Sequence, residues 1–598
     1  MQFLVVVAAC VVASTSIEIR PSRNYLENNK IPPLEQSKNP HGTSKFPYTY
    51  ASICLNGTKG ESLNIVYAKQ CKNKEAQVAL GRYSNQVNTT GWGILEIETF
   101  SGHPYDLQAY AAGVAEGEFF KGVLTHQQIH YHYMNTVQNL CKNHTQYCTR
   151  LYKYLTKNLD WMRSKVIEEP PSDLYWRHVN LTFAQLTGIY DAYMKRNLVP
   201  GIGFDLSPIL TIQLSGELFD LNKLFNKTPD PQEYPEAGRC SGLVKVAPGN
   251  KDLFFAHVAM SSLSWMMRVL KLYKFAYDAK EVPGRMVSFS GYPGQLSSAD
   301  DYTLTSAGLV GLSDFHCKDS DYYCDEKGSI ETTISIFNKA LYSDTYIKPE
   351  GQVHCWIRST ISNYLTRTAE EWAKLFSRYN SGTYNNQWTI VDYKKFKPGQ
   401  ELPDKDIGSI QAQDVTWYLK RFSYWPSYNV PFITEISIIS GFSEKARDFD
   451  WYKWGASPRA RIFDRDHHKV HDMDTLTKLM RYNDYTHDEF ARCKCSPFPY
   501  TAEGGISARG DLNVPNGTYE VESMGFRDHA GLDFKGTNYE MFSKLRFRAW
   551  GGPPYDPLPP FDWSTTKVVA NHFGQPQLWN FTYVDLEWEA ETNVLGFG

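Results

Sequence analysis

The sequence predicts an α+β fold in which helices pack against antiparallel β-sheets, because strand and helix signals alternate in blocks and not as regular strand–helix units. The segment CSGLVKVAPGNKDLFFAHVAM, residues 240–260, predicts two strands joined by a tight turn. The segment RTAEEWAKLFSRY, residues 367–379, predicts a helix that opens with a capping box between Thr368 and Glu371. Aromatic residues run from end to end without a repeat or a long linker, so we expect one compound domain.

Other segments add to this layered fold. Strands are expected around residues 63–67 and 91–99, and over QWTIVDYKKF at 387–396. Helices are expected over 106–158, where apolar residues recur at helical spacing. A further helix is expected from 261 to about 278, with a broad apolar side made of Leu263, Met266, Met267, Leu270 and Leu272.

The turn between the two strands of 240–260 sets their register. If the turn centres on Gly249 and Asn250, paired positions add up to 499, and Gly242 lies opposite His257. Cys240 is two residues before Gly242 and therefore shares its sheet face. The sequence thus predicts that Cys240 and His257 are diagonal neighbours.

The N-terminus points to a secretory route. In MQFLVVVAACVVASTS, residues 1–16, an apolar stretch is followed by small residues, as in a signal peptide. No later stretch is long and apolar enough to predict a transmembrane helix. We expect a glycoprotein of the secreted or lysosomal lumen, because seven N-x-[ST] sequons are present, with acceptors Asn56, Asn88, Asn143, Asn180, Asn226, Asn516 and Asn580.

The cysteines fit an oxidising compartment, since most fall into local pairs. These pairs are Cys54/Cys71, Cys141/Cys148, Cys317/Cys324 and Cys493/Cys495. Cys10 lies in the expected signal peptide, and Cys240 and Cys355 are left over. A bridge across C-x-C closes a strained small ring, so a pairing of Cys355 with Cys493 or Cys495 stays open as an alternative.

Composition and motifs exclude several classes of protein. A net charge of −3 and no basic stripe argue against a nucleic-acid partner. The chain has no G-x-S-x-G, H-E-x-x-H or P-loop motif. In DRDHHKVHD, residues 464–472, His467 and His471 could share a helical face and bind a metal, but a solvated charged segment is the commoner structure for this composition. We expect no metal and no cofactor.

The segment TPDPQEYPEAGR, residues 228–239, predicts an exposed processing loop, because its three prolines cannot continue a helix or a central strand. A cut after Arg239 would leave residues 17–239 and 240–598 as two fragments, with Cys240 at a new N-terminus. Its α-amino group would then be a general base for its own thiol. A buried, unreactive cysteine is the alternative for any single Cys.

Several segments together resemble the phospholipase B-like family, also described as laminin ancestor-like. They occur in order as RCSGLVKVAPGNKDLFFAH, SFSGYPG, DDYTL, ETTISIFNK, NSGTYNNQW, WPSYNVPF, SPRARIF and MRYNDY, and the resemblance extends to GQPQLWNF near the C-terminus. It implies an N-terminal nucleophile hydrolase with an αββα sandwich of two antiparallel sheets between helical layers. It also implies autocatalytic cleavage before Cys240, with both fragments held together non-covalently as one compound domain; a homodimer is compatible with it.

The resemblance implies a role for each matching residue. Cys240, His257, Asn429 and Arg459 match catalytic positions, and Thr333 matches a threonine at the substrate. An asparagine amide suits an oxyanion hole, and Arg459 could lower the pKa of the thiol or bind a substrate anion.

Met260 replaces a tryptophan usual in the family, at a position expected to contact substrate.

The implied activity is hydrolysis of an acyl ester of a phospholipid or of an N-acyl amide. The alternative is a non-catalytic luminal lipid-binding protein with the same fold.

Overall fold

The computed structural model describes residues 46–56, 62–118, 125–228, 239–300, 302–307, 327–410 and 413–592. The expected signal peptide (1–16), residues 229–238 of the processing loop and the expected Cys317/Cys324 pair lie outside the described residues. Within the described ranges, no helix is both long and apolar enough to span a membrane.

The larger sheet has eleven strands in the described part of the chain, in the order β13-β12-β11-β10-β9-β8-β7-β4-β3-β1-β2. Neighbouring strands are antiparallel except β4 and β7, which run parallel. The strands are β1 (Thr49–Leu55), β2 (Leu63–Val66), β3 (Gln77–Gln86), β4 (Trp92–Thr99), β7 (Arg268–Lys274), β8 (Met286–Gly291), β9 (Tyr302–Thr305), β10 (Lys327–Thr332), β11 (Gln387–Asp392), β12 (Gly408–Ile410) and β13 (Gln413–Asp414).

The smaller sheet follows the order β14-β5-β6-β16-β17-β20, and β15 pairs with β6. Its strands are β5 (Arg239–Val246), β6 (Leu253–Ser261), β14 (Tyr424–Ser427), β15 (Ala530–Gly531), β16 (Asp533–Thr537), β17 (Arg548–Gly551) and β20 (Val584–Asp585). A separate two-stranded ribbon is made by β18 (Phe561–Asp562) and β19 (Leu578–Trp579).

The two sheets share one apolar core. Val244 and Phe255 of the smaller sheet belong to the same buried cluster as Leu272 and Ile330 of the larger sheet. The Phe255 ring also packs directly on Gly328 of β10, where an added Cβ would lie 2.9 Å from the ring. The sheets therefore pack face to face, with alternate residues of each strand pointing into the space between them.

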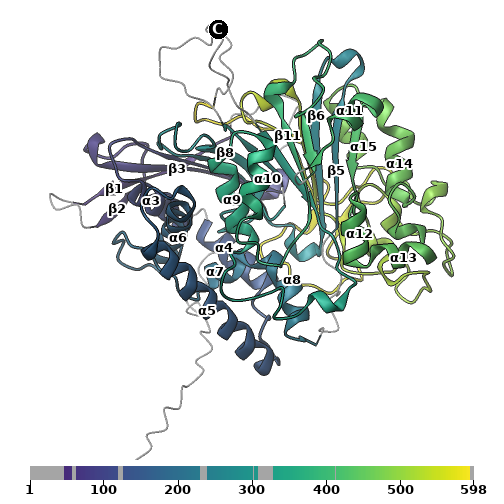
Figure 1. Ribbon diagram of the computed structural model, residues 1–598, viewed down its shortest axis with the longest axis horizontal. Coiled ribbons are helices and arrows are strands. Elements are labelled where there is room, and N and C mark those ends of the chain that lie inside the picture. The colour runs from purple at the N-terminus through teal and green to yellow at the C-terminus, as the bar shows by residue number, and fades with distance from the viewer. Residues whose placement is uncertain are drawn as a thin grey trace, which may run out of the picture. The chain divides into compact units, whose positions relative to one another are not determined.

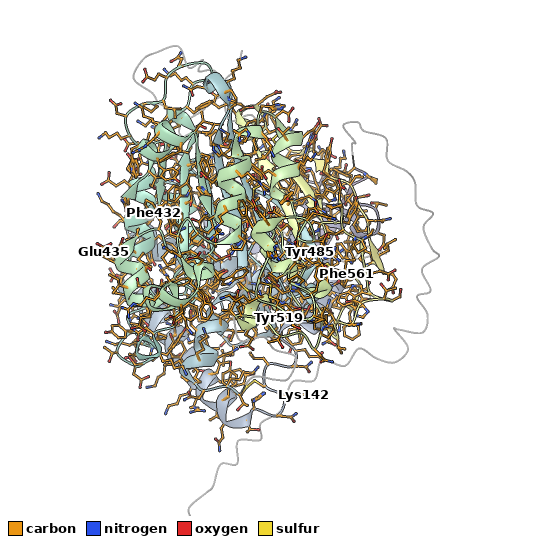
Figure 2. All side chains as sticks on the ribbon, turned by 90° about the vertical axis from the view of Figure 1, so that its right-hand side faces the viewer. Lys142, Phe432, Glu435, Tyr485, Tyr519 and Phe561 are labelled. Atoms are coloured by element: carbon orange, nitrogen blue, oxygen red, sulfur yellow. A yellow bond between two sulfur atoms is a disulfide. The ribbon has the colours of Figure 1, made fainter. Side chains whose placement is uncertain are left out.

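Helices cover the outer face of each sheet (Figure 1). On the larger sheet lie α3 (Tyr105–Gly117), packed on α6 (Leu174–Tyr193), and α10 (Ala369–Ser377), packed on α9 (Cys355–Leu365). On the smaller sheet lie α14 (Pro458–Asp466) and α15 (Met473–Met480), where side chains fill a second buried cluster. Figure 2 looks onto this second helical layer. The α+β class and the packing of helices on antiparallel sheets are confirmed.

The remaining helices connect these layers. They are α2 (Val87–Thr90), α4 (Thr125–Thr136), α5 (Thr145–Glu168), α7 (Pro208–Gln213), α8 (Ser215–Leu224), α11 (Thr416–Phe422), α12 (Thr434–Ser440), α13 (Phe442–Asp448) and α16 (Tyr539–Phe542). The strands expected at 63–67, 91–99 and 387–396 are confirmed as β2, β4 and β11, and the helical stretch 106–158 as α3, α4 and most of α5. The capping box is also confirmed, because Thr368 Oγ1 accepts from the Glu371 N–H at 3.1 Å and Glu371 Oε2 accepts from the Thr368 N–H at 3.2 Å.

The helix expected from 261 to about 278 is wrong. Only a single turn forms at Leu263–Trp265, and Arg268–Lys274 is strand β7. This strand lies inside the larger sheet and is covered on both faces, so both sets of alternating residues are buried. Leu272 faces the other sheet, while Lys271 Nζ on the opposite face contacts Glu116 Oε1 of α3 at 2.7 Å. In RVLKLYK the basic residues Arg268, Lys271 and Lys274 recur every third position, a spacing that also fits a helix, so the sequence pattern does not identify the strand.

Three disulfides are present among the described residues, Cys54–Cys71, Cys141–Cys148 and Cys493–Cys495. The alternative pairing of Cys355 with Cys493 or Cys495 is therefore wrong. Cys240 and Cys355 are both buried and lie outside these bridges.

The sequon asparagines lie mostly at the surface. Six are exposed, and Asn180 is half-buried on α6. The exposed six are Asn56, Asn88, Asn143, Asn226, Asn516 and Asn580.

Candidate active site

The β5–β6 hairpin has the register that the turn predicts. Gly242 pairs with His257, and Cys240 pairs with Ala259. Cys240 and Gly242 share the strand face of Val244, which belongs to the core between the two sheets. The thiol of Cys240 and the imidazole of His257 therefore lie on the same inner face as diagonal neighbours, and this prediction is confirmed.

The backbone of Cys240 is bound on both sides by side chains from distant segments. Its N–H donates to Asn429 Oδ1 at 2.8 Å. Its carbonyl accepts from Arg459 Nη1 at 2.5 Å. Both contacts are buried, so they hold the start of β5 in one position in a region that excludes water.

Arg459 reaches this point from the first turn of α14. Ser457 caps that helix, and Pro458 begins it. Besides the Cys240 carbonyl, the guanidinium donates to Asn429 Oδ1 at 2.8 Å and to the Tyr428 carbonyl at 2.7 Å. Arg459 thus organises the backbone around Cys240, and its contacts with oxygen atoms use the fork of donors that only an arginine provides.

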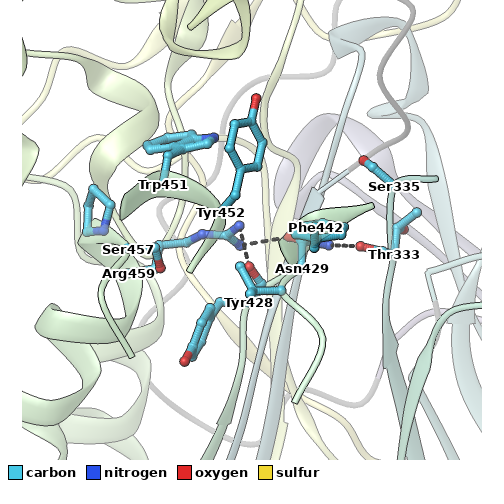
Figure 3. A pocket seen from close by; sticks show the side chains of 11 residues that line it. Thr333, Ser335, Tyr428, Asn429, Phe442, Trp451, Tyr452, Ser457 and Arg459 are labelled. Carbon is cyan, nitrogen blue, oxygen red and sulfur yellow. Dashed lines mark hydrogen bonds between the residues drawn. The ribbon is translucent and has the colours of Figure 1, made fainter. Parts of the chain in front are cut away.

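Asn429 follows β14 and has a left-handed backbone with φ of 63°. Asparagine tolerates this conformation better than most residues. Its Nδ2 donates to the Thr333 carbonyl at 2.8 Å, directly after β10. Thr333 therefore joins the site through its backbone, and one chain of hydrogen bonds links Thr333, Asn429, Arg459 and Cys240. Figure 3 shows the part of this chain that joins Thr333, Asn429 and Arg459.

His257 is fully buried, and its Nε2 lies 2.9 Å from the Glu331 carbonyl. A carbonyl can only accept, so Nε2 carries the proton and Nδ1 carries the lone pair. Nδ1 has no hydrogen-bond partner among the described residues. Burial holds the pKa of His257 well below its usual range, and the nearby Lys535 lowers it further. The imidazole is therefore neutral, with an unprotonated nitrogen inside the site.

A group of buried charges beside His257 was not expected from the sequence. Lys535 of β16 pairs with His257 in the sheet, and its Nζ contacts Asp533 Oδ2 at 2.8 Å. Asp533 also accepts from the Ala259 N–H at 2.9 Å and contacts Arg268 at 2.7 Å. In the segment LDFKGT, charges alternate with other residues, a pattern typical of a strand with one solvent-exposed face, so this segment does not predict a buried site.

The structure does not bring Met260 to this site. Met260 follows Ala259 on β6, and successive residues of a strand point to opposite faces. Its buried side chain belongs to the cluster between the smaller sheet and the α14–α15 layer, together with Leu243 and Val258. The side chain of Met260 therefore lies on the other side of the sheet from the Cys240 thiol, and its contact with substrate stays a prediction.

A narrow pocket opens next to Asn429 and Arg459 (Figure 3). It has a polar side and an aromatic side, and a cavity volume of about 20 Å³, enough for about one water molecule. Its lining residues are Thr333, Ser335, Tyr428, Asn429, Val430, Phe442, Trp451, Tyr452, Ser457, Pro458 and Arg459.

The DRDHHKVHD segment does not gather ligands for a metal. Asp466 contacts Lys469 at 2.6 Å and Arg465 at 2.8 Å, and the His467 ring stacks on Tyr424 at 3.8 Å between centroids. Across the described ranges, no group of three or more His, Cys, Asp and Glu side chains could hold a metal ion. The charges of this segment are occupied by structural ion pairs.

Comparison with known proteins agrees with the motifs of this site. The family model described as Phospholipase B matches residues 79–586, a range that includes every residue of the site. The chain belongs to the phospholipase B-like family.

Relatives in this family cover nearly the whole chain. A Caenorhabditis elegans protein named "Putative phospholipase B-like 3" is 66% identical over 585 residues, which are 96% of this chain and 97% of that protein. A human protein named "Putative phospholipase B-like 2" is 36% identical over 591 residues, 95% of this chain and 92% of that protein. A Dictyostelium discoideum protein named "Phospholipase B-like protein B" is 32% identical over 534 residues, 86% of each chain.

Proposed function

We propose that this phospholipase B-like protein is an N-terminal nucleophile hydrolase of the secretory or lysosomal lumen, which cuts its own chain before Cys240 and then hydrolyses acyl ester or amide bonds. The observation that supports the proposal most directly is that the backbone of Cys240 is held in place on both sides. Its N–H and its carbonyl are each bound by a buried side chain, Asn429 and Arg459, and its thiol lies on the face of His257.

In the self-cleavage step, the Cys240 sulfur attacks the carbonyl carbon of Arg239. The peptide C–N bond breaks, its nitrogen takes a proton and becomes the α-amino group of Cys240, and a thioester joins Arg239 to the sulfur. Water then hydrolyses the thioester, which leaves a carboxylate on Arg239 and regenerates the thiol. Asn429 Oδ1, which accepts from the amide N–H before the cut, is placed to accept from the α-amino group afterwards.

In turnover, the α-amino group takes the thiol proton while the sulfur attacks the substrate carbonyl carbon. The proton passes to the leaving alcohol or amine, and water releases the acyl group from the thioester. Asn429 Nδ2 has two N–H bonds, one of which is used by the Thr333 carbonyl. The second is available to donate to the oxyanion, the stabilisation that such transition states need most.

The fragments share secondary structure, which supports their staying together after the cut. β4 lies before the cut and β7 after it, and these strands pair over seven residues from Trp92/Arg268 to Glu98/Lys274. The larger sheet is therefore built from both fragments. Separating them would break this ladder and expose the core between the sheets.

The aromatic residues beside Asn429 support an apolar group in the substrate, although the pocket as it stands has room for only about one water molecule. Phe442, Trp451 and Tyr452 form its aromatic side, while Asn429 and Arg459 form its polar side. Such a combination of apolar wall and a few placed polar groups is typical of small-molecule sites. Phospholipids and N-acyl amides both carry an acyl chain next to a carbonyl, and we propose these two classes as substrates.

The proposal is tested with processed wild type and with Cys240→Ala, assayed in parallel on a diacyl phospholipid and on an N-acyl amide. We expect acyl release by the wild type alone, unaffected by a chelator. Equal acyl release by both proteins would show that Cys240 is not the nucleophile. Loss of activity with a chelator would favour metal catalysis. A processed wild type that binds lipid without releasing an acyl group would favour a binding protein, although Met260, which first suggested that role, lies away from the site.

A further inference from the structure

Four ionisable side chains meet on the inner face of three neighbouring strands, β5, β6 and β16. In one row across the sheet, Gly242 pairs with His257, which pairs with Lys535. In the adjacent row, Cys240 pairs with Ala259, whose N–H donates to Asp533 Oδ1. Gly242 has no side chain and Ala259 only a methyl group. The thiol, the imidazole, the ammonium and the carboxylate therefore project into the same small volume.

Lys535 is a fully buried cation in this volume. Its side chain has no exposed surface, and its Nζ lies 3.0 and 2.8 Å from the two oxygens of Asp533. Asp533 is shared with Arg268 of β7 at 2.7 Å, and Arg268 in turn contacts Asp300. Burial lowers the pKa of Lys535 to about 8, although Asp533 and the Cys240 thiol raise it. Lys535 is thus protonated at neutral and acidic pH.

The charges of the described groups around the sulfur are not balanced while the thiol is neutral. Arg268, Lys535 and Arg459 supply three cations, and Asp300 and Asp533 supply two carboxylates. His257 is neutral in this environment because its pKa is held well below its usual range. Arg481 is a further buried cation whose charge interacts with Asp533. A thiolate at Cys240 would therefore reduce the excess of positive charge in this region, which is favoured inside a protein because charges there are weakly screened.

We propose that Lys535 is the cationic partner of the Cys240 sulfur, and that its buried ammonium stabilises the thiolate form both before and after the chain is cut. The proposal rests on the proposed function, since it concerns the same nucleophile. Lys535 acts here as a positioning residue through its charge. The proton lost by the thiol goes to the solvent in the uncut chain and to the α-amino group of Cys240 after the cut.

The uncut chain needs a group that activates the Cys240 thiol, and Lys535 can do so. Before cleavage, the nitrogen of Cys240 is an amide, which has no basic lone pair, so it cannot take the thiol proton as it does in the mature protein. A thiolate is the reactive form of cysteine, and a neighbouring lysine is one of the groups that stabilise it. Lys535 is present in both forms of the chain, and its position is independent of the cut because it lies on the inner strand β16.

The test is a titration of the Cys240 thiolate by its ultraviolet absorbance, taken as the difference between each protein and the same protein with Cys240→Ser. This readout needs neither processing nor turnover, so it separates this proposal from the proposed function. In Lys535→Met we expect the thiolate fraction at a fixed acidic pH to fall about tenfold or more. Because a tenfold change corresponds to about one pH unit, the pH profile of self-cleavage should move to higher pH by about one unit or more. Lys535→Arg, which keeps the charge, is expected to restore most of the thiolate.

Lys245→Met is the matched control. Lys245 lies on β5 and resembles Lys535 in that burial lowers its pKa to about 8. It differs because it lies on the outer face of the sheet, where its Nζ contacts Ser423. We expect its thiolate titration to match the wild type. If Lys535→Met does not fold, Lys535→Gln, which can still donate to Asp533, takes its place. A Cys240 titration that is the same in wild type and Lys535→Met or Lys535→Gln would overturn the proposal, even if Cys240 proves to be the nucleophile.

Discussion

Asn429 Oδ1 accepts a hydrogen bond from the backbone N–H of Cys240 at 2.8 Å, although 189 residues separate the two in the chain. The same oxygen accepts from Arg459 Nη1, which also binds the Cys240 carbonyl. A single amide and a single guanidinium therefore fix both peptide groups of the cysteine. In the proposed mechanism, the first of these peptide groups contains the bond that is cut, and its nitrogen becomes the base.

Removal of the Asn429 side chain is expected to slow self-cleavage by about a hundredfold, the usual effect of losing an oxyanion donor. Asn429→Gly keeps the left-handed backbone, whereas Asn429→Ala adds strain of about 1 kcal/mol. Both variants should therefore process equally slowly and unfold at lower urea than wild type, because both lose the buried hydrogen bonds of Asn429, and the alanine variant should unfold at the lowest urea. Processing is followed by gel electrophoresis; a glycine variant that processes as fast as wild type would remove Asn429 from the mechanism.

Arg459→Lys is expected to slow processing and to lower the free energy of unfolding by about 2 kcal/mol, because one ammonium cannot reach the oxygens of Cys240, Asn429 and Tyr428 together. Arg461→Lys is the control, since Arg461 lies on the same helix in an exposed ion pair with Asp450. Its change in stability should be within about 0.5 kcal/mol. Urea unfolding and the processing rate measure both effects, and equal results for the two variants would contradict this account.

Gly242 must lack a side chain because the sheets approach closely next to the site. A Cβ at this position would lie 2.7 Å from Ile330 Cδ1 of β10. Gly242→Ala is therefore expected to destabilise the protein by about 1–3 kcal/mol. Ile330→Val removes the clashing methyl group and should recover part of this loss, so a double-mutant cycle should show coupling between the positions. Additive effects of the two substitutions would place them out of contact.

Acidic pH is expected to stabilise the contact between the two proposed fragments. Burial raises the pKa of Glu217 on α8 from 4.5 to about 7, and Glu217 Oε1 accepts from the N–H of Trp356 on α9 at 3.4 Å. The folded state therefore keeps a proton that the unfolded state loses. This stabilisation is fully present below pH 4.5 and is lost, by about 3 kcal/mol, as the pH rises to about 7.

Glu217→Gln should flatten that part of the stability profile, because a neutral amide replaces the protonated carboxyl. Glu168→Gln, at an exposed position on α5, should leave the profile unchanged. The measurement is urea unfolding between pH 4.5 and 7.5, and a wild-type profile that rises with pH across this window would show that Glu217 is not protonated in the folded state.

Local signals in the sequence predicted the parts of the fold that depend on neighbours in the chain. The Gly249–Asn250 turn set the register that places Cys240 beside His257, and Thr368 and Glu371 marked the start of α10. Strand β7 was misread as a helix because both of its faces are buried, so it lacks the alternation that distinguishes a strand. Its parallel partner β4 is more than 160 residues away, beyond any local signal.

The residues of the site also differ in whether local sequence signals could predict them. Asn429 and Arg459 could be assigned only from the family motifs, since nothing near them in the chain indicates their contact with Cys240. Lys535 and Asp533 were missed because charged residues that alternate along a strand usually face water. Here they face the space between the sheets, and this depends on the packing of the whole domain. Met260 was placed at the substrate by its distance from His257 in sequence, which does not reveal the face of the strand.

The central claim is that the chain cuts itself between Arg239 and Cys240. It is tested most directly by N-terminal sequencing and intact mass of purified wild type and Cys240→Ala after incubation at acidic pH. We predict two wild-type fragments, one beginning at Cys240, and an uncut Cys240→Ala chain. A wild-type chain that stays intact, or a Cys240→Ala chain cut at the same bond, would contradict the account.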